Sequence, residues 1–168
     1  MKQAKNIAIA GATGMVGQTF LTLLESQYFQ NSKITLLASS NSKGREISFR
    51  NAVYVVQDLA DFDFSETDLA FFSAGADVSD TYAPKAVLQG CVVVDNSSRF
   101  RYENDIPLIV PEVNGPELQN YSLPGIIANP NCSTIQMLVA LKPIHDEFVI
   151  ERLDITTLQA VSGTGKNA

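Results

Sequence analysis

The stretch GATGMVG, residues 11–17, joins two segments with different hydrophobic patterns. The apolar residues 7–10 before it predict a short buried strand, and apolar positions at helical spacing after it predict a helix over 15–28. Its spacing, G-x-x-G-x-x-G, is a variant of the turn whose glycines let the backbone approach a pyrophosphate, which the helix N-terminus attracts. The stretch therefore predicts a dinucleotide site. The alternative is a glycine-rich turn that binds nothing.

Further short apolar runs follow, with room for helices between most of them. We predict strands at 34–38, 69–74, 91–95, 108–110 and 126–128, helices over 78–88 and 133–148, a partly alternating segment at 47–56 and a strand-rich segment at 153–161. Short apolar strands separated by helices predict an α/β fold. We expect a Rossmann-like, doubly wound, mostly parallel sheet with helices on both faces.

Composition and charge exclude several classes of protein. The 168 residues are 45% hydrophobic and 18% charged, which argues against disorder and against a coiled coil. No apolar run is long enough to cross a bilayer, and no secretory signal is recognised. The net charge of −6 argues against a nucleic-acid partner or an anionic membrane surface. Two cysteines make no disulfide framework, so a reduced, cytoplasmic setting is expected.

The residues after the second predicted strand bear on the choice of cofactor. An NAD site places an acidic residue there to hold the ribose 2′-hydroxyl. Residues 39–45, SSNSKGR, instead offer hydroxyls and two cations, and no acid occurs before Glu46. That chemistry suits a 2′-phosphate, so we expect NADP. The alternative is a solvated loop with incidental charges.

The two cysteines differ in their surroundings. Cys91 lies inside an apolar run and reads as a small core residue. Cys132 lies in NPNCST, residues 129–134, at a polar junction before an apolar helix. A helix N-terminus favours the thiolate form, so Cys132 is the candidate nucleophile.

Five stretches together resemble the N-terminal half of the aspartate-semialdehyde dehydrogenase family. They follow the family's order and spacing over essentially the whole chain. They are GATGMVG at 11–17, DNSS at 95–98, VPEVN at 110–114, NPNCST at 129–134 and QAVSG at 159–163.

The resemblance implies a reaction and a set of residue roles. Members of the family convert aspartyl phosphate reductively to aspartate semialdehyde and release phosphate, in the biosynthesis of lysine, threonine and methionine. Cys132 matches the nucleophile that carries the acyl group as a thioester, while Arg101, Gln159 and Asn131 match positions that bind substrate or phosphate. Positions that match the NADP site are Gly11, Thr13, Gly14, Met15, Val16, Gly17, Ser39, Asn41, Ser42, Ser162 and Gly163. No metal is implied, and the full-length protein is expected to be a homodimer.

Two features depart from the family pattern. The family often has arginine where Asn41 stands, so the 2′-phosphate contact shifts to Lys43 or Arg45, or the preference for NADP weakens. The only histidine, His145, has no motif match and reads as a surface residue. The family's acid/base histidine and a second substrate-binding arginine lie downstream of this chain's last residue.

These features give an expected domain organisation. We expect an NADP-binding domain over 1–128 and, over 129–168, the beginning of an α+β catalytic domain. No closing element follows, so we expect an incomplete fragment that is inactive by itself. One rival is N-acetyl-glutamyl-phosphate reductase, whose cysteine motif has glycine and tyrosine where Asn131 and Ser133 stand. The other is a non-enzymatic NADP-sensing module, which has no use for Cys132.

Overall fold

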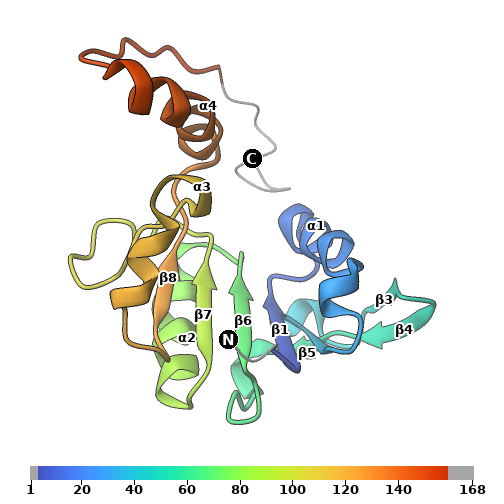
Figure 1. Cartoon of the computed structure of the whole chain (residues 1–168). Helices are drawn as coiled ribbons and strands as arrows, with labels where there is room; N and C mark the ends of the chain where they lie inside the picture. The colour runs from blue at the N-terminus through green and yellow to red at the C-terminus, as the bar shows by residue number, and fades with distance from the viewer. Residues whose placement is uncertain (1–3, 159–168) are drawn as a thin grey trace.

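The computed structural model describes residues 4–158, which form an α/β fold around one parallel six-stranded sheet (Figure 1). The strands, in the spatial order β5-β2-β1-β6-β7-β8, are β5 Gln57–Asp58, β2 Lys33–Ala38, β1 Asn6–Ala10, β6 Leu69–Phe72, β7 Val92–Asp95 and β8 Ile126–Ala128. The chain builds outward from β1 to β5 and then returns to the other side of β1. The loop after β1 therefore lies at the switch point, where sheets of this type bind ligands.

The remaining elements connect these strands. They are α1 Met15–Leu24, η1 Gln27–Phe29, η2 Ser40–Ser42, β3 Glu46–Phe49, β4 Ala52–Val55, η3 Leu59–Asp61, α2 Ala76–Leu88, α3 Pro111–Asn114, η4 Gly115–Asn120 and α4 Cys132–Phe148.

Helices cover both faces of the sheet, which confirms the doubly wound expectation. Successive side chains of a strand point to opposite faces. On β1, Ile7 and Ile9 belong to the buried cluster that includes residues of α1, whereas Ala8 and Ala10 belong to the cluster that includes residues of α2. Because both faces are buried, the strand reads in the sequence as one continuous apolar run.

The segment predicted to alternate over 47–56 contains an antiparallel hairpin of β3 and β4, residues 46–55, which forms a separate two-stranded sheet. Its turn is made by Arg50 and Asn51, with φ of 51° and 58°. Two consecutive left-handed residues make the two-residue turn that best matches the twist of hairpin strands. The usual Asn-Gly signal is missing, so no local pattern marks the turn that divides this segment into two strands.

Three predicted elements are shorter than expected or are wrong. The first helix ends at Leu24, not at Tyr28, and the 3₁₀ turn η1 follows after two residues. The predicted strand at 108–110 reduces to one bridge between Leu108 and Ala128, because Pro111 begins α3 immediately afterwards. The predicted strand at 153–161 has no regular secondary structure over 153–158, and its remaining residues lie outside the described ones.

Helix α4 extends beyond the carboxyl ends of the strands and packs next to α3 (Figure 1). None of its residues is buried, and Phe148 near its end is 76% exposed. Much of the apolar surface of α4 is therefore left uncovered by the described residues. Among residues 4–158, no helix combines the length and apolar character needed to span a membrane.

Candidate functional site

The glycine loop is held against two strands by its backbone. The amides of Gly11 and Ala12 both donate to the carbonyl oxygen of Leu37 in β2, at 2.9 and 3.1 Å. Gly11 has a φ of +89°, and a Cβ there would lie 2.5 Å from the carbonyl oxygen of Ser73, beyond β6. A Cβ on Gly17 would lie 2.3 Å from the oxygen of Gly11. These two glycines are required by close backbone packing.

Gly14 has a different role, because a Cβ there would meet only the oxygen of Gly11, at 3.3 Å. Gly14 is the N-cap of α1, and no side chain caps the helix. The amides of the first turn thus lack a capping side chain and suit an anion. Met15 and Val16 in that turn are 55% and 41% exposed, and Thr13 before them is half-buried. This cradle fits the pyrophosphate of a dinucleotide.

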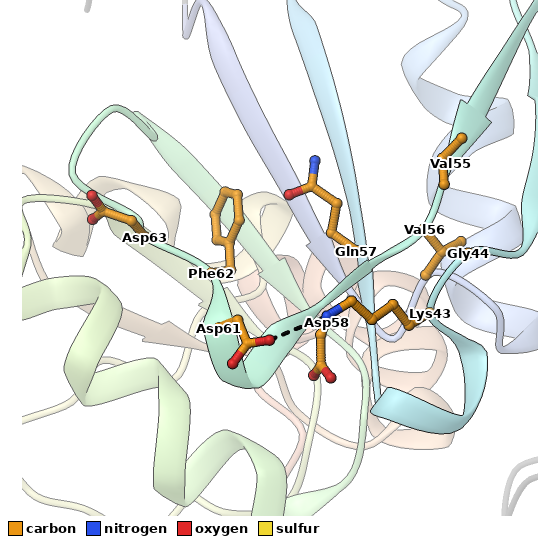
Figure 2. Close-up of a pocket in the computed structure, with 9 residues that line it drawn as sticks. All are labelled: Lys43, Gly44, Val55, Val56, Gln57, Asp58, Asp61, Phe62 and Asp63. Carbon is orange, nitrogen blue, oxygen red and sulfur yellow. Dashed lines mark hydrogen bonds and ion pairs between the residues drawn. The ribbon is translucent and has the colours of Figure 1, made fainter.

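The loop after β2 is accessible and polar. Ser39 and Asn41 are exposed, and Ser42 is half-buried in η2. The loop borders a pocket of about 580 Å³ whose other walls come from β4, β5 and η3 (Figure 2). The pocket is lined by Lys43, Gly44, Val55, Val56, Gln57, Asp58, Asp61, Phe62 and Asp63.

Acidic residues lie near this loop, which the sequence pattern did not reveal. Asp58, the last residue of β5, is the register partner of Ala38, the last residue of β2. It therefore lies beside the point where the loop begins. Figure 2 shows Lys43 reaching Asp61, with Nζ 3.2 Å from Oδ2. One of the two cations expected to face a 2′-phosphate is therefore engaged with a carboxylate, while Arg45 has an exposed side chain.

Cys132 is the first residue of α4 and is exposed. Asn131 caps the helix: its Oδ1 accepts from the amide and the hydroxyl of Ser133, at 3.0 and 2.6 Å. The thiol of Cys132 lies 3.8 Å from the same oxygen. Cys91 is fully buried instead, and burial, followed by the charge of Asp68, raises the pKa of its thiol to about 12. Only Cys132 is placed to act as a nucleophile.

Arg99 and Arg101 lie two residues apart and differ in their partners. Arg99 pairs with Glu103 and Asp80, and its hydrogen bonds to Glu103 and then to Asp80 raise the pKa of its guanidinium. Arg101 is half-buried and donates to two backbone carbonyls, through Nε to Asn129 at 2.8 Å and through Nη2 to Asn96 at 3.3 Å. Within residues 4–158 no carboxylate pairs with Arg101, so its charge is available to an anion.

His145 is far from Cys132 along the same helix. Thirteen residues separate them, which corresponds to about 20 Å of helix. The His145 ring is exposed, and its Nδ1 accepts from the amide of Ile150 at 3.2 Å. This placement leaves His145 outside the surroundings of Cys132. Gln159, Ser162 and Gly163 lie outside the described residues.

Comparison with known proteins decides the family. The semialdehyde dehydrogenase NAD-binding domain family matches residues 6–121. The chain belongs to this family. It is 58% identical over its full length to the aspartate-semialdehyde dehydrogenase of Legionella pneumophila, of which it covers 48%. The chain thus spans about half the length of the curated relatives it matches.

Solved structures of the same family share the fold of the chain. Aspartate semialdehyde dehydrogenase II from Vibrio cholerae, complexed with ASA, is 50% identical and superposes with a TM-score of 0.90 over 99% of this chain and 49% of its own. The Candida albicans enzyme with NADP is 32% identical and superposes with a TM-score of 0.72 over 87% of this chain and 48% of its own. The α/β fold is therefore that of the N-terminal half of these dehydrogenases, with a dinucleotide-binding domain.

Proposed function

We propose that this chain is the cofactor-binding and nucleophile-bearing half of an NADP-dependent aspartate-semialdehyde dehydrogenase, which reduces aspartyl phosphate to aspartate semialdehyde and phosphate. One observation carries the proposal beyond family membership. Exposed Cys132 begins α4 only three residues after Asn129, whose carbonyl accepts a hydrogen bond from Arg101. No carboxylate among residues 4–158 pairs with this arginine. The nucleophile Cys132 and the anion-binding Arg101 thus both contact or belong to the short segment 129–132.

The chain's residues have distinct chemical roles in this proposal. The thiolate of Cys132 attacks the acyl carbon, and the carbon–oxygen bond to phosphate breaks with its electron pair leaving on the phosphate. Arg101 binds that phosphate through its planar donors. Asn131 orients the thiol, and Gln159 binds the substrate by resemblance to the family. Bound NADPH supplies the hydride that reduces the acyl group. Cys132 then takes back the electron pair of the carbon–sulfur bond as the aldehyde leaves.

The glycine loop and the loop after β2 would hold the cofactor. Gly11, Gly14 and Gly17 fit a dinucleotide because the loop is closely packed on one side and open at Gly14. Ser39, Asn41, Ser42, Ser162 and Gly163 join them by resemblance to the family. We favour NADP because hydroxyls follow β2 directly and the exposed Arg45 lies at the end of the same loop. The Candida albicans relative was also solved with NADP.

Cofactor choice can be tested by calorimetric titration of NADP and NAD into the chain. NADP should bind more tightly at low salt, and the margin should shrink as salt rises. Arg45→Ala should narrow the margin more than Lys43→Ala, because Lys43 is paired with Asp61. Asp61→Asn releases Lys43 and should widen the difference in affinity between NADP and NAD. Asp63→Asn is the control and should leave that difference unchanged. Equal affinities for the two cofactors at low salt would reject the preference for NADP.

The reaction itself has a covalent readout. Aspartyl phosphate without NADPH should acylate Cys132, which mass spectrometry of the tryptic peptides detects. The Cys91→Ala variant should be acylated equally, and Cys132→Ala should not be acylated. A correctly placed nucleophile also needs an acid/base group, which contributes about 10²- to 10⁴-fold in rate. We expect turnover near background for these 168 residues and turnover restored in a polypeptide of the relatives' full length. Robust turnover lost on changing His145 would overturn this view.

We also propose that the cofactor domain ends at residue 128 and that the catalytic domain begins at 129. The absence of buried residues in α4 supports this division, because the helix lacks a core of its own among the described residues. In a full-length enzyme we expect a homodimer, by resemblance to the family. Sedimentation velocity of the full-length enzyme would measure this directly, and a monomer at micromolar concentration would reject it.

A further inference from the structure

We propose that Asn96 and Asn129 form a brace that positions Arg101 for a phosphate group. This inference rests on the proposed function, because it assigns the residues that keep the anion-binding arginine in place. Neither asparagine is among the residues matched to a substrate or cofactor site. The carboxyl ends of β7 and β8 provide the geometry.

The brace extends the sheet by one step. The last paired residues of β7 and β8 are Asp95 and Ala128, and the next residues along the two strands are Asn96 and Asn129. The Asn129 amide donates through Nδ2 to Oδ1 of Asn96, at 3.0 Å. The Asn129 backbone amide also donates to the carbonyl of Asp95, at 2.9 Å. The two strand ends are therefore joined by a side-chain bond where the backbone ladder stops.

The carbonyl oxygens of these same two residues accept from Arg101. Nε reaches Asn129 at 2.8 Å and Nη2 reaches Asn96 at 3.3 Å. The guanidinium thus bridges the two strands that the side-chain bond ties together. A planar group with two fixed acceptors has little freedom to rotate, so its other donors keep one direction. The carbonyls are neutral, and the positive charge remains available to an anion.

A buried hydroxyl network fixes the loop that carries Arg101. The carboxylate of Asp95 is fully buried and accepts from the hydroxyls of Ser79 in α2 and of Ser97, each at 2.6 Å. Ser97 in turn accepts from the amide of Arg99, at 3.1 Å. Phe100, beside Arg101, lies in the core at 4% exposure. The backbone on either side of the brace therefore has few ways to relax.

The brace also connects the arginine to the nucleophile. Asn129 precedes Cys132 by three residues, and Asn131 between them caps α4. A shift of Asn129 would therefore move the arginine and the start of the nucleophile helix together. Small errors in the position of reacting groups cost rate steeply. A side-chain bond at this point keeps the phosphate-binding group and the thiol in one arrangement.

The test uses the 168-residue chain and inorganic phosphate as the probe, followed by NMR at the Arg101 Nε–H signal. In the unsubstituted chain this proton should exchange slowly and shift as phosphate is added. Reading the titration at Arg101 separates this site from phosphate bound at the glycine loop. Asn96→Ala and Asn129→Ala remove opposite ends of one bond. Each should speed exchange and weaken phosphate binding by about three- to tenfold, as expected when one hydrogen bond is lost.

The double variant and two controls make the result specific. Asn96→Ala with Asn129→Ala should bind phosphate no more weakly than either single variant, because both remove the same interaction. Asn104→Ala, an exposed change on the same loop, and the Arg99 Nε–H signal should stay unaffected. If Asn129→Ala does not fold, Asn96→Ala tests the same bond from the other strand.

The outcomes separate this inference from the proposed function. Unchanged phosphate binding in the asparagine variants, with binding lost in Arg101→Ala, would overturn the brace and leave the function standing. Additive losses in the double variant would also overturn it. Phosphate that never shifts Arg101 in the unsubstituted chain would refute the brace and the role of Arg101. Acylation of Cys132 is measured independently and would remain.

Discussion

Replacing Gly17 by alanine should destabilise the fold, whereas replacing Gly14 by alanine should not. A Cβ on Gly17 would lie 2.3 Å from the oxygen of Gly11 and 2.7 Å from the Cα of Ala12, and both are backbone atoms. Because neither can rotate away, the loop or α1 must shift, and such overpacking costs about 1–3 kcal/mol. Both contacts are far shorter than a Cβ makes in a folded protein, which places the cost at the upper end of that range. Alanine regains about 1 kcal/mol of helix propensity, so the net loss is about 2 kcal/mol.

Thermal unfolding followed by circular dichroism measures this loss. For a chain of this size, a loss of about 2 kcal/mol corresponds to a fall in Tm of about 4–8 °C. Gly14→Ala should leave Tm unchanged, because Gly14 has a φ of −81° and its Cβ would meet one atom, at 3.3 Å. Gly14→Val should keep the fold and abolish NADP binding, since its side chain enters the cradle for the pyrophosphate.

Two results would refute this reasoning. Gly17→Ala with the Tm of the unsubstituted chain would show that the loop is not closely packed against α1. A folded Gly14→Val that binds NADP with unchanged affinity would show that the loop is a turn without a ligand. Calorimetric titration of the folded variants with NADP distinguishes a binding defect from loss of fold.

Three further predictions concern the thiols, the end of α1 and the buried carboxylate. At pH 8 iodoacetamide should modify Cys132 in the folded chain while Cys91 stays unmodified, because Cys91 is buried and the pKa of its thiol is raised to about 12. Modification of Cys91 at similar rates before and after urea denaturation would contradict this. Arg50 donates to four backbone carbonyls near the end of α1, so Arg50→Ala should lower the free energy of unfolding by about 2 kcal/mol. Arg50→Lys should recover less than half of that free energy, because lysine lacks the planar set of donors. Asp95→Ala leaves the buried hydroxyl of Ser79 without its acceptor and should cost about 3 kcal/mol in urea unfolding, with Asp95→Asn intermediate; an unchanged midpoint would exclude a stabilising network.

The sequence alone determined those features that depend on neighbours along the chain. The glycine loop, its preceding strand and its following helix are read from local pattern, because tight turns and one-sided burial constrain nearby residues. The helix predicted over 78–88 is present in the structure as Ala76–Leu88, two residues longer at its start. The junction that makes Cys132 a candidate nucleophile is also local, since Asn131 caps the helix that Cys132 begins.

Only the tertiary structure decided which distant residues meet. Parallel pairing of β2 with β5 brings Asp58 beside the loop expected to select NADP, although twenty residues separate Asp58 from Ala38. Pairing of β7 with β8 joins Asn96 to Asn129 around Arg101, across an even longer stretch of chain. The hydrophobic pattern within one segment does not predict which strands pair, because strand order and register arise from burial of both sheet faces at once.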